Sequence, residues 1–183
     1  AALYETPIEH CVTDFLVTDA RLAAALDDAR TPQTNAERLL LRQSDDCLDI
    51  SLYIDAGVLA ALADSDPYEH LGGDNLNDFL IALEGVSHFN YVIWNARHQR
   101  QVTQLELELQ AEVDKYVTAL MLLDEQGTVP DADAFHGTLF EAVVFDTGGD
   151  ADSEQRYREA NRYAGKYCHG LSRRFPGQHR EPS

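Results

Sequence analysis

The sequence predicts an α+β fold that is mostly helical, with five or six helices and one β-hairpin near residues 38–54. Two observations lead to this fold class. One stretch of the chain alternates between apolar and polar side chains, which is the period of a β-strand. Most of the other segments carry apolar residues at helical spacing, and glycine and proline separate them into short elements.

The strand signal is strongest in residues 47–54, where apolar side chains occupy every second position from Leu48 to Ile54. Residues 37–43 precede a turn-rich Ser-Asp-Asp sequence, so we expect 38–43 to pair with 47–54 in a hairpin. A competing interpretation is a short helix over 36–42, opened by a capping box between Thr34 and Glu37. Because an isolated hairpin is marginal in water, its apolar face should pack on helices or join a further strand.

Six segments are typical of helices. The first should end by residue 30, because Pro32 disfavours helix in the residue before it. Asp74 or Asn75 should cap the third, whose nearly all-round apolarity predicts a central, largely buried helix. A capping box between Thr103 and Glu106 should open the fourth. We expect helices from residue 14 or 18 to 30, and over 56–63, 75–98, 103–123, 132–145 and 152–174.

No repeat or linker divides the 183 residues, and a chain of this length can bury a core of its own. We therefore expect a single domain over residues 1–183. Residues 1–13 should form a loosely attached lead-in, and residues 176–183 a frayed tail.

The strongest global signal is charge. The chain carries 32 acidic residues against 14 basic ones, a net charge of −18, and only two of the bases are lysine. Acids spread over every segment, together with scarce lysine, favour adaptation to high salt. The alternative is a mimic of nucleic acid, which should concentrate its acids on one face. Either way the charge makes nucleic acid an unlikely partner.

Cysteine content and hydropathy predict a cytoplasmic, soluble protein. Cys11, Cys47 and Cys168 are widely spaced and include no CxxC pair, so we expect reduced thiols and neither a zinc ribbon nor a redox motif. No apolar stretch approaches the ~20 residues of a membrane span, and the N-terminal residues lack the features of a secretory signal. We expect no membrane association.

Residues 75–98 contain the first candidate for chemistry. Glu84 and His88 are four residues apart, so their side chains can meet on one helix face and could supply two metal ligands, or a base and the group that orients it. They belong to a polar stripe on an otherwise apolar helix. The simpler interpretation is a narrow strip facing solvent. The stripe consists of Asn77, Glu84, His88, Tyr91 and Asn95.

Glu112 is the second candidate, because it falls within the apolar stripe of the helix over 103–123. A carboxylate on a core face must be paired, hydrogen-bonded or protonated. We expect a buried ion pair with Arg97 of the preceding helix, and the alternative is a catalytic carboxylate. Glu106, Glu108 and Asp114 point elsewhere and are expected to be solvated.

The last helix carries the third candidate, a basic stripe opposite an apolar side that includes Tyr157 and Tyr167. Residues 155–183 hold seven bases and two acids, a net charge of +5, whereas residues 1–154 hold seven and thirty, a net charge of −23. We expect the stripe to face acids of this chain or of a second copy, and the alternative is a phosphate or nucleic-acid site. The stripe consists of Arg158, Arg162, Lys166, His169 and Arg173.

No nucleotide-binding, zinc-protease, hydrolase, EF-hand or kinase signature is present, and no cofactor is predicted. We therefore expect a non-catalytic interaction or regulatory protein, with a protein partner or a second copy in a homodimer. The alternative is a small helical enzyme or metal-binding protein that uses Glu84, His88 and Glu112.

Overall fold

The computed structural model describes residues 10–27, 35–44, 47–128, 131–141 and 151–174. The chain forms two compact units, residues 1–102 and 103–183, and each is described here by itself. The expectation of one domain stays a prediction. Four predicted features lie outside the described residues: the lead-in before residue 10, the helix end near Pro32, the end of the helix over 132–145 and the tail.

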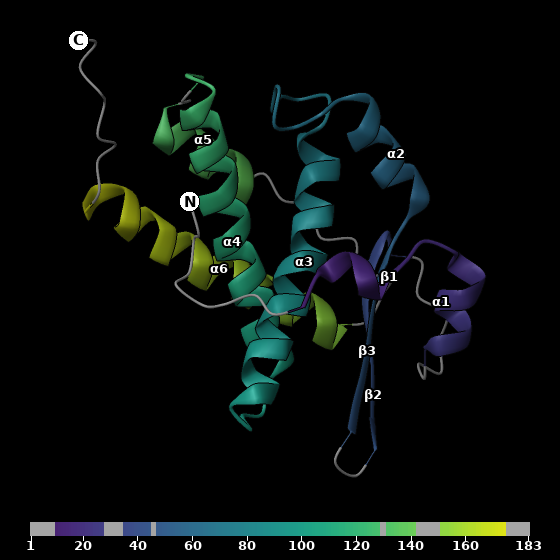
Figure 1. The fold of residues 1–183 in the computed structure, drawn as a ribbon. Coiled ribbons are helices and arrows are strands. Elements are labelled where there is room, and N and C mark those ends of the chain that lie inside the picture. The colour runs from purple at the N-terminus through teal and green to yellow at the C-terminus, as the bar shows by residue number, and fades with distance from the viewer. Residues whose placement is uncertain (1–9, 28–34, 45–46, 129–130, 142–150, 175–183) are drawn as a thin grey trace. The chain divides into compact units, whose positions relative to one another are not determined.

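Unit 1 combines a small sheet with helices, as Figure 1 shows. Its β2–β3 hairpin confirms the predicted pairing of 38–43 with 47–54, because the strands are antiparallel from Glu37 opposite Ile54 to Ser44 opposite Cys47. β1 adds in parallel to the other edge of β3, which gives the strand order β1-β3-β2. The elements are η1 (Val12–Phe15), β1 (Leu16–Val17), α1 (Ala20–Leu26), β2 (Glu37–Ser44), β3 (Cys47–Ile54), α2 (Ala56–Asp64) and α3 (Leu76–Arg97).

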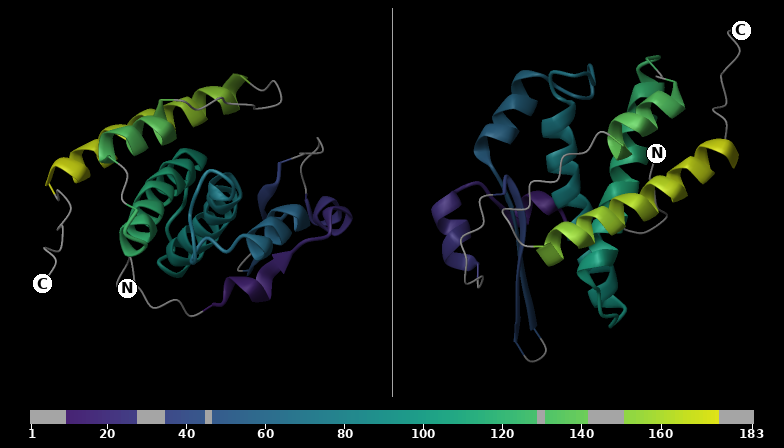
Figure 2. Two further views of the ribbon diagram at one scale, coloured as in Figure 1. Left: turned by 90° about the horizontal axis from the view of Figure 1, so that it is seen from above. Right: turned by 180° about the vertical axis from the view of Figure 1, so that it is seen from behind.

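Alternation along the hairpin sends side chains to two apolar clusters. On one face, Leu52 and Ile54 pack against Phe89 of α3 and Val58 of α2. On the other face, Leu40 and Tyr53 pack against Ala23 of α1. Figures 1 and 2 show α3 and α1 on opposite sides of the sheet within this unit. The hairpin thus gains both the helices and the extra strand that it needs for stability.

An ion pair stabilises the α1 side of the sheet. Arg38 is 8% exposed, lies 4.7 Å above the centre of the Tyr53 ring and forms a 3.1 Å ion pair with Asp27. The far half of the hairpin, by contrast, is exposed on β2 and β3 and extends beyond α1 (Figure 1). Leu41 and Leu48 are among its exposed residues.

The prediction of one helix from residue 14 or 18 to 30 is wrong in its first part. Val12–Phe15 forms a 3₁₀ turn, Leu16–Val17 pairs with β3, and only Ala20–Leu26 is α-helical. Helix propensity gave the wrong prediction because Leu16 and Val17 can form hydrogen bonds with the open edge of β3 instead. Asp19 then caps α1 by accepting hydrogen bonds from the backbone amides of Arg21 and Leu22.

Asn75 occupies the N-cap of α3, as predicted, but its side chain makes no capping hydrogen bond. Asn75 is 1% exposed, and its side-chain amide links parts of the preceding loop. The side-chain NH₂ group donates to the backbone carbonyls of His70 and Ser65, and the side-chain oxygen accepts from the backbone N–H of Gly72. α3 is also less uniformly buried than its composition predicts, because Trp94 remains 36% exposed.

Unit 2 consists of α4 (Gln104–Glu125), α5 (Ala132–Phe140) and α6 (Ala151–Arg174). The predicted capping box between Thr103 and Glu106 opens α4. α4 packs mainly against α6. Tyr116 of α4, 2% exposed, lies against the rings of Phe135 and Phe140. The small buried side chains are Ala111, Ala119, Ala160 and Ala164.

Six α-helices and a three-stranded mixed sheet among the described residues confirm the predicted α+β, mostly helical fold. Among those residues, no helix combines the length and the apolarity that crossing a bilayer requires.

Candidate functional site

Glu84 and His88 come together on the face of α3 that meets the sheet. His88 is only 8% exposed, Glu84 is half-buried, and Asn95 of the same stripe is 2% exposed. The interpretation of this stripe as a strip facing solvent is therefore wrong for His88 and Asn95, whereas Asn77 in the first turn of α3 is exposed. At Glu84 and His88 the neighbouring strand also presents a polar side chain.

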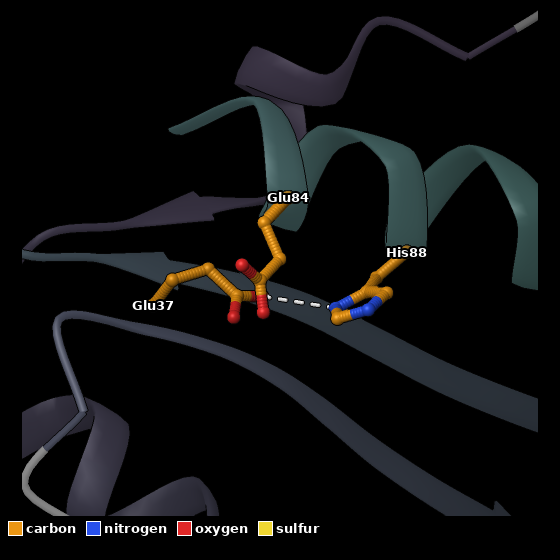
Figure 3. Close-up of side chains that lie close together, drawn as sticks. All are labelled: Glu37, Glu84 and His88. Atoms are coloured by element: carbon orange, nitrogen blue, oxygen red, sulfur yellow. Dashed lines mark ion pairs between the residues drawn. The ribbon is translucent and has the colours of Figure 1, made fainter. Parts of the chain in front are cut away.

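That side chain is Glu37, the first residue of β2. Its Oε1 atom lies 3.5 Å from Nδ1 of His88, and the two side chains are 12% and 10% exposed. One ligand atom from each of Glu37, Glu84 and His88 lies within 4.8 Å of the other two. Figure 3 shows the two carboxylates and the imidazole converging from β2 and α3. Two of these three residues were predicted as candidates.

Glu37 carried a signal in the sequence that pointed to this position. Strand side chains alternate between faces, so Glu37 shares a face with Leu39, which packs in the α3 cluster. A carboxylate in phase with core residues is the same kind of anomaly that singled out Glu112. Sequence alone could not pair Glu37 with α3, because that requires the sheet to be docked on the helix.

Gly85 makes the close approach of β2 and α3 possible. A Cβ atom at this position would lie 2.7 Å from Cγ of Glu37 and 2.8 Å from Cδ1 of Leu52. Both distances are shorter than ordinary van der Waals contact. The glycine stands between Glu84 and His88 in the sequence, so the missing side chain leaves room for Glu37 beside both of them.

The chemistry of the cluster follows from its charge. Two carboxylates held near one another and largely out of water repel, and burying charge is costly unless it is neutralised. A proton on one of the groups or a bound cation would relieve this repulsion. An imidazole nitrogen beside two carboxylate oxygens is a donor set that suits divalent transition metals.

Glu112 belongs to unit 2, and within that unit its carboxylate lies 2.6 Å from Nζ of Lys115, one turn along α4. Its side chain is 20% exposed. Arg97 is exposed and contacts His10 in unit 1. The predicted burial of both partners is therefore wrong for Arg97, and the Arg97–Glu112 pair stays a prediction. Asp114, expected to be solvated, is instead 8% exposed and accepts a hydrogen bond from Gln110.

Cys168 of α6 is a buried ionisable group close enough to Glu112 to feel its charge. The thiol is fully buried. Burial, and after it the negative charge of Glu112, raises the pKa of the Cys168 thiol to about 12. A thiol of this kind is protonated at neutral pH and unreactive.

The basic stripe of α6 lies on the exposed side of that helix. Arg158, Arg162, Lys166 and His169 are all exposed, and the side chain of Arg173 lies outside the described part of the chain. Arg158 pairs with Glu154 one turn earlier on the same helix. Tyr167, predicted on the covered side, is 57% exposed.

Comparison with models of known protein families, with curated protein sequences and with solved structures gave no match to this chain.

Proposed function

We propose that the protein binds a divalent first-row transition metal through Glu37, Glu84 and His88. The observation that supports this function is the convergence of their ligand atoms within 4.8 Å in a largely buried site. A divalent cation would offset the repulsion between the two carboxylates and would join β2 to α3.

The distances suit such an ion after small adjustments. Two ligand atoms bound to one tetrahedral metal at ordinary bond lengths lie ~3.4 Å apart. The 3.5 Å between Oε1 of Glu37 and Nδ1 of His88 is close to that value. Glu84 completes the set by a shift of about one ångström or a change of rotamer, which a half-buried glutamate can make.

Three protein ligands leave at least one position for water. A site of that kind can activate the bound water or accept a further ligand, whereas structural zinc sites usually have four protein ligands. The mixed nitrogen and oxygen donors favour Zn²⁺, Mn²⁺ or Fe²⁺ over Ca²⁺ and Mg²⁺, which prefer oxygen ligands alone.

The direct test is calorimetric titration of Zn²⁺ into chelator-treated protein, followed by the visible absorption of a Co²⁺-substituted sample. We expect one saturable site per chain and a higher melting temperature when the metal is bound. Glu84→Gln and His88→Gln should each lower the affinity by at least ten-fold.

Matched controls distinguish binding at the site from the weak, non-specific binding of cations that a chain of net charge −18 can show. Glu69→Gln and His70→Gln change exposed side chains of unit 1 and should leave the titration unchanged. Equal binding by all five proteins, or no saturable site in the wild type, would refute the metal-binding function.

We also propose a second function, an interaction or regulatory role that involves no catalysis. The observation that favours it is the exposed face of α6, where cations stand beside Tyr163 and Tyr167, which are 45% and 57% exposed. The spread of acids and the scarcity of lysine support a salt-adapted protein. No disulfide joins the three cysteines, all within the described ranges, which supports a reducing cytoplasm.

A further inference from the structure

We infer that the outward face of α6 binds the α6 helix of a second copy of this chain. The two helices would run antiparallel around a two-fold axis level with Arg162 and Tyr163. The inference rests on the proposed interaction role, names its partner, and is independent of the metal site in unit 1.

The face is defined by the pattern of exposure along α6. The helix has 24 residues and is therefore ~36 Å long. Its buried side turns inward in unit 2, and its opposite side is open. The buried residues are Ala160, Asn161, Ala164, Gly165 and Cys168, and the exposed ones are Asp152, Gln155, Arg158, Arg162, Tyr163, Lys166, Tyr167 and His169.

Charge is unevenly distributed along this face. At 100° per residue, its centre carries Glu159, Tyr163, Lys166 and Gly170. The acids of α6 all lie in its first nine residues, together with Arg156 and Arg158, and the four bases from Arg162 onward have no acid among them. An antiparallel copy therefore brings the acids of one helix beside the bases in the second half of the other.

The two-fold axis pairs opposite charges along the seam. Glu159 and Lys166 lie equally far from a point between Arg162 and Tyr163, so each Glu159 would be level with the partner's Lys166. Such pairs between antiparallel helices set register and orientation.

The middle of the seam also fits a second copy. The Arg162 guanidinium lies 4.6 Å from the centre of the Tyr163 ring within one chain, and across the axis it would reach the partner's Tyr163 as well. Apart from the helix's own backbone and the two chain neighbours, no atom of the described residues lies within 4 Å of the position that a Cβ atom would take at Gly170. That opening admits the partner's Gln155, which is level with it.

Nucleic acid fits this face less well than a second copy does. Glu159 lies on the same seam as Lys166 and would repel phosphate, and the whole chain carries a net charge of −18. Because each copy contributes one helix to a small interface, the dimer should form reversibly at micromolar or higher concentration.

Sedimentation equilibrium of the full chain tests the inference, in about 0.5 M NaCl so that repulsion between the two acidic chains is screened. We expect a concentration-dependent dimer. Lys166→Glu and Glu159→Lys should each weaken dimerisation at least ten-fold by placing like charges opposite one another. The double variant should restore it, because the pair is then reversed. Arg21→Glu, the same charge change on exposed α1, should leave dimerisation unchanged.

Three outcomes would overturn the inference. These are a monomer at every concentration, a dimer that neither single charge reversal weakens, and a double variant no better than the single ones. Steep, salt-dependent binding of a labelled duplex by the wild type, lost in Lys166→Glu, would assign the face to nucleic acid instead. Circular dichroism checks that each variant is folded, and the Zn²⁺ titration stays an independent measure of the metal site.

Discussion

At the scale of single residues, Gly85 has the clearest structural role in the candidate site. Replacing glycine by alanine inside a helix usually stabilises a protein by roughly 0.5–1 kcal/mol. At Gly85 the added methyl would meet Glu37 and the fully buried Leu52 at distances below 3.0 Å. The cost of this overpacking should therefore exceed the gain in helix propensity.

We predict that Gly85→Ala lowers the free energy of unfolding by about 1–3 kcal/mol, measured by urea denaturation. Because the displaced Glu37 is a proposed ligand, the variant should also bind Zn²⁺ more weakly. Gly137→Ala in α5 is the matched control, since the one contact that its Cβ would make with the described residues is to the Glu141 carboxylate at 3.9 Å. The control should be neutral or stabilising, and similar effects of the two changes would contradict the role given to Gly85.

Cys168 leads to a prediction about alkaline pH. Its pKa is about 12 in the folded protein, against ~8.5 for an ordinary thiol. At a pH between these two pKa values, the thiol has lost its proton in the unfolded chain but keeps it in the folded protein. The contribution of Cys168 to the stability of the folded protein is therefore complete below the ordinary pKa and is lost as pH rises toward 12.

We expect the free energy of unfolding of the wild type to fall more steeply above pH 9 than that of Cys168→Ala. Thiol labelling at pH 8 offers a second measurement. The exposed Cys11 and Cys47 should react at once and Cys168 only on unfolding. Three equally fast thiols in the folded protein would show that Cys168 is accessible.

At the scale of elements, the start of α4 is defined by two reciprocal hydrogen bonds. The Thr103 hydroxyl accepts from the amide of Glu106, and the Glu106 carboxylate accepts from the amide of Thr103. These bonds satisfy donors that the first turn of a helix leaves without an intrahelical partner.

We predict that Thr103→Ala costs about 1 kcal/mol in the free energy of unfolding. Because the two side chains act together, the double variant with Glu106→Ala should cost less than the sum of the two single changes. Gln104→Ala, at an exposed position in the same turn, is the control and should be nearly neutral. Additive effects in chemical denaturation would indicate that the two hydrogen bonds are independent.

At the scale of the whole molecule, the excess of acid should make stability depend on salt. A net charge of −18 gives repulsion that the Debye length of ~30 Å at 0.01 M salt leaves largely unscreened. At 1 M salt the Debye length is ~3 Å and the repulsion is confined to near neighbours.

We therefore predict that the melting temperature rises markedly between about 0.01 M and about 1 M NaCl. Calorimetry over that range measures the melting temperature. A second series in K₂SO₄ at equal ionic strength distinguishes charge screening from effects specific to chloride. A flat or falling curve would remove salt adaptation and restore the interpretation of the chain as a mimic of nucleic acid.

The sequence pattern was sufficient to predict a feature wherever the residues that interact in it lie close together in the chain. The alternation from Leu48 to Ile54 identified the hairpin, and Thr103 with Glu106 identified the start of α4, because both signals arise within a few residues. Spacing along one helix likewise identified Glu84 and His88 as neighbours. The basic stripe of α6 also required only helical periodicity.

Contacts between distant segments followed from packing instead. Leu16 and Val17 pair with β3 because that strand has an open edge. Helix propensity describes only local preference and gives no information about such an edge. Glu37 reached Glu84 and His88 because the sheet docks on α3 at a glycine. The proposed metal site therefore depends on tertiary structure, since its third candidate ligand comes from a strand whose position relative to α3 no local pattern specifies.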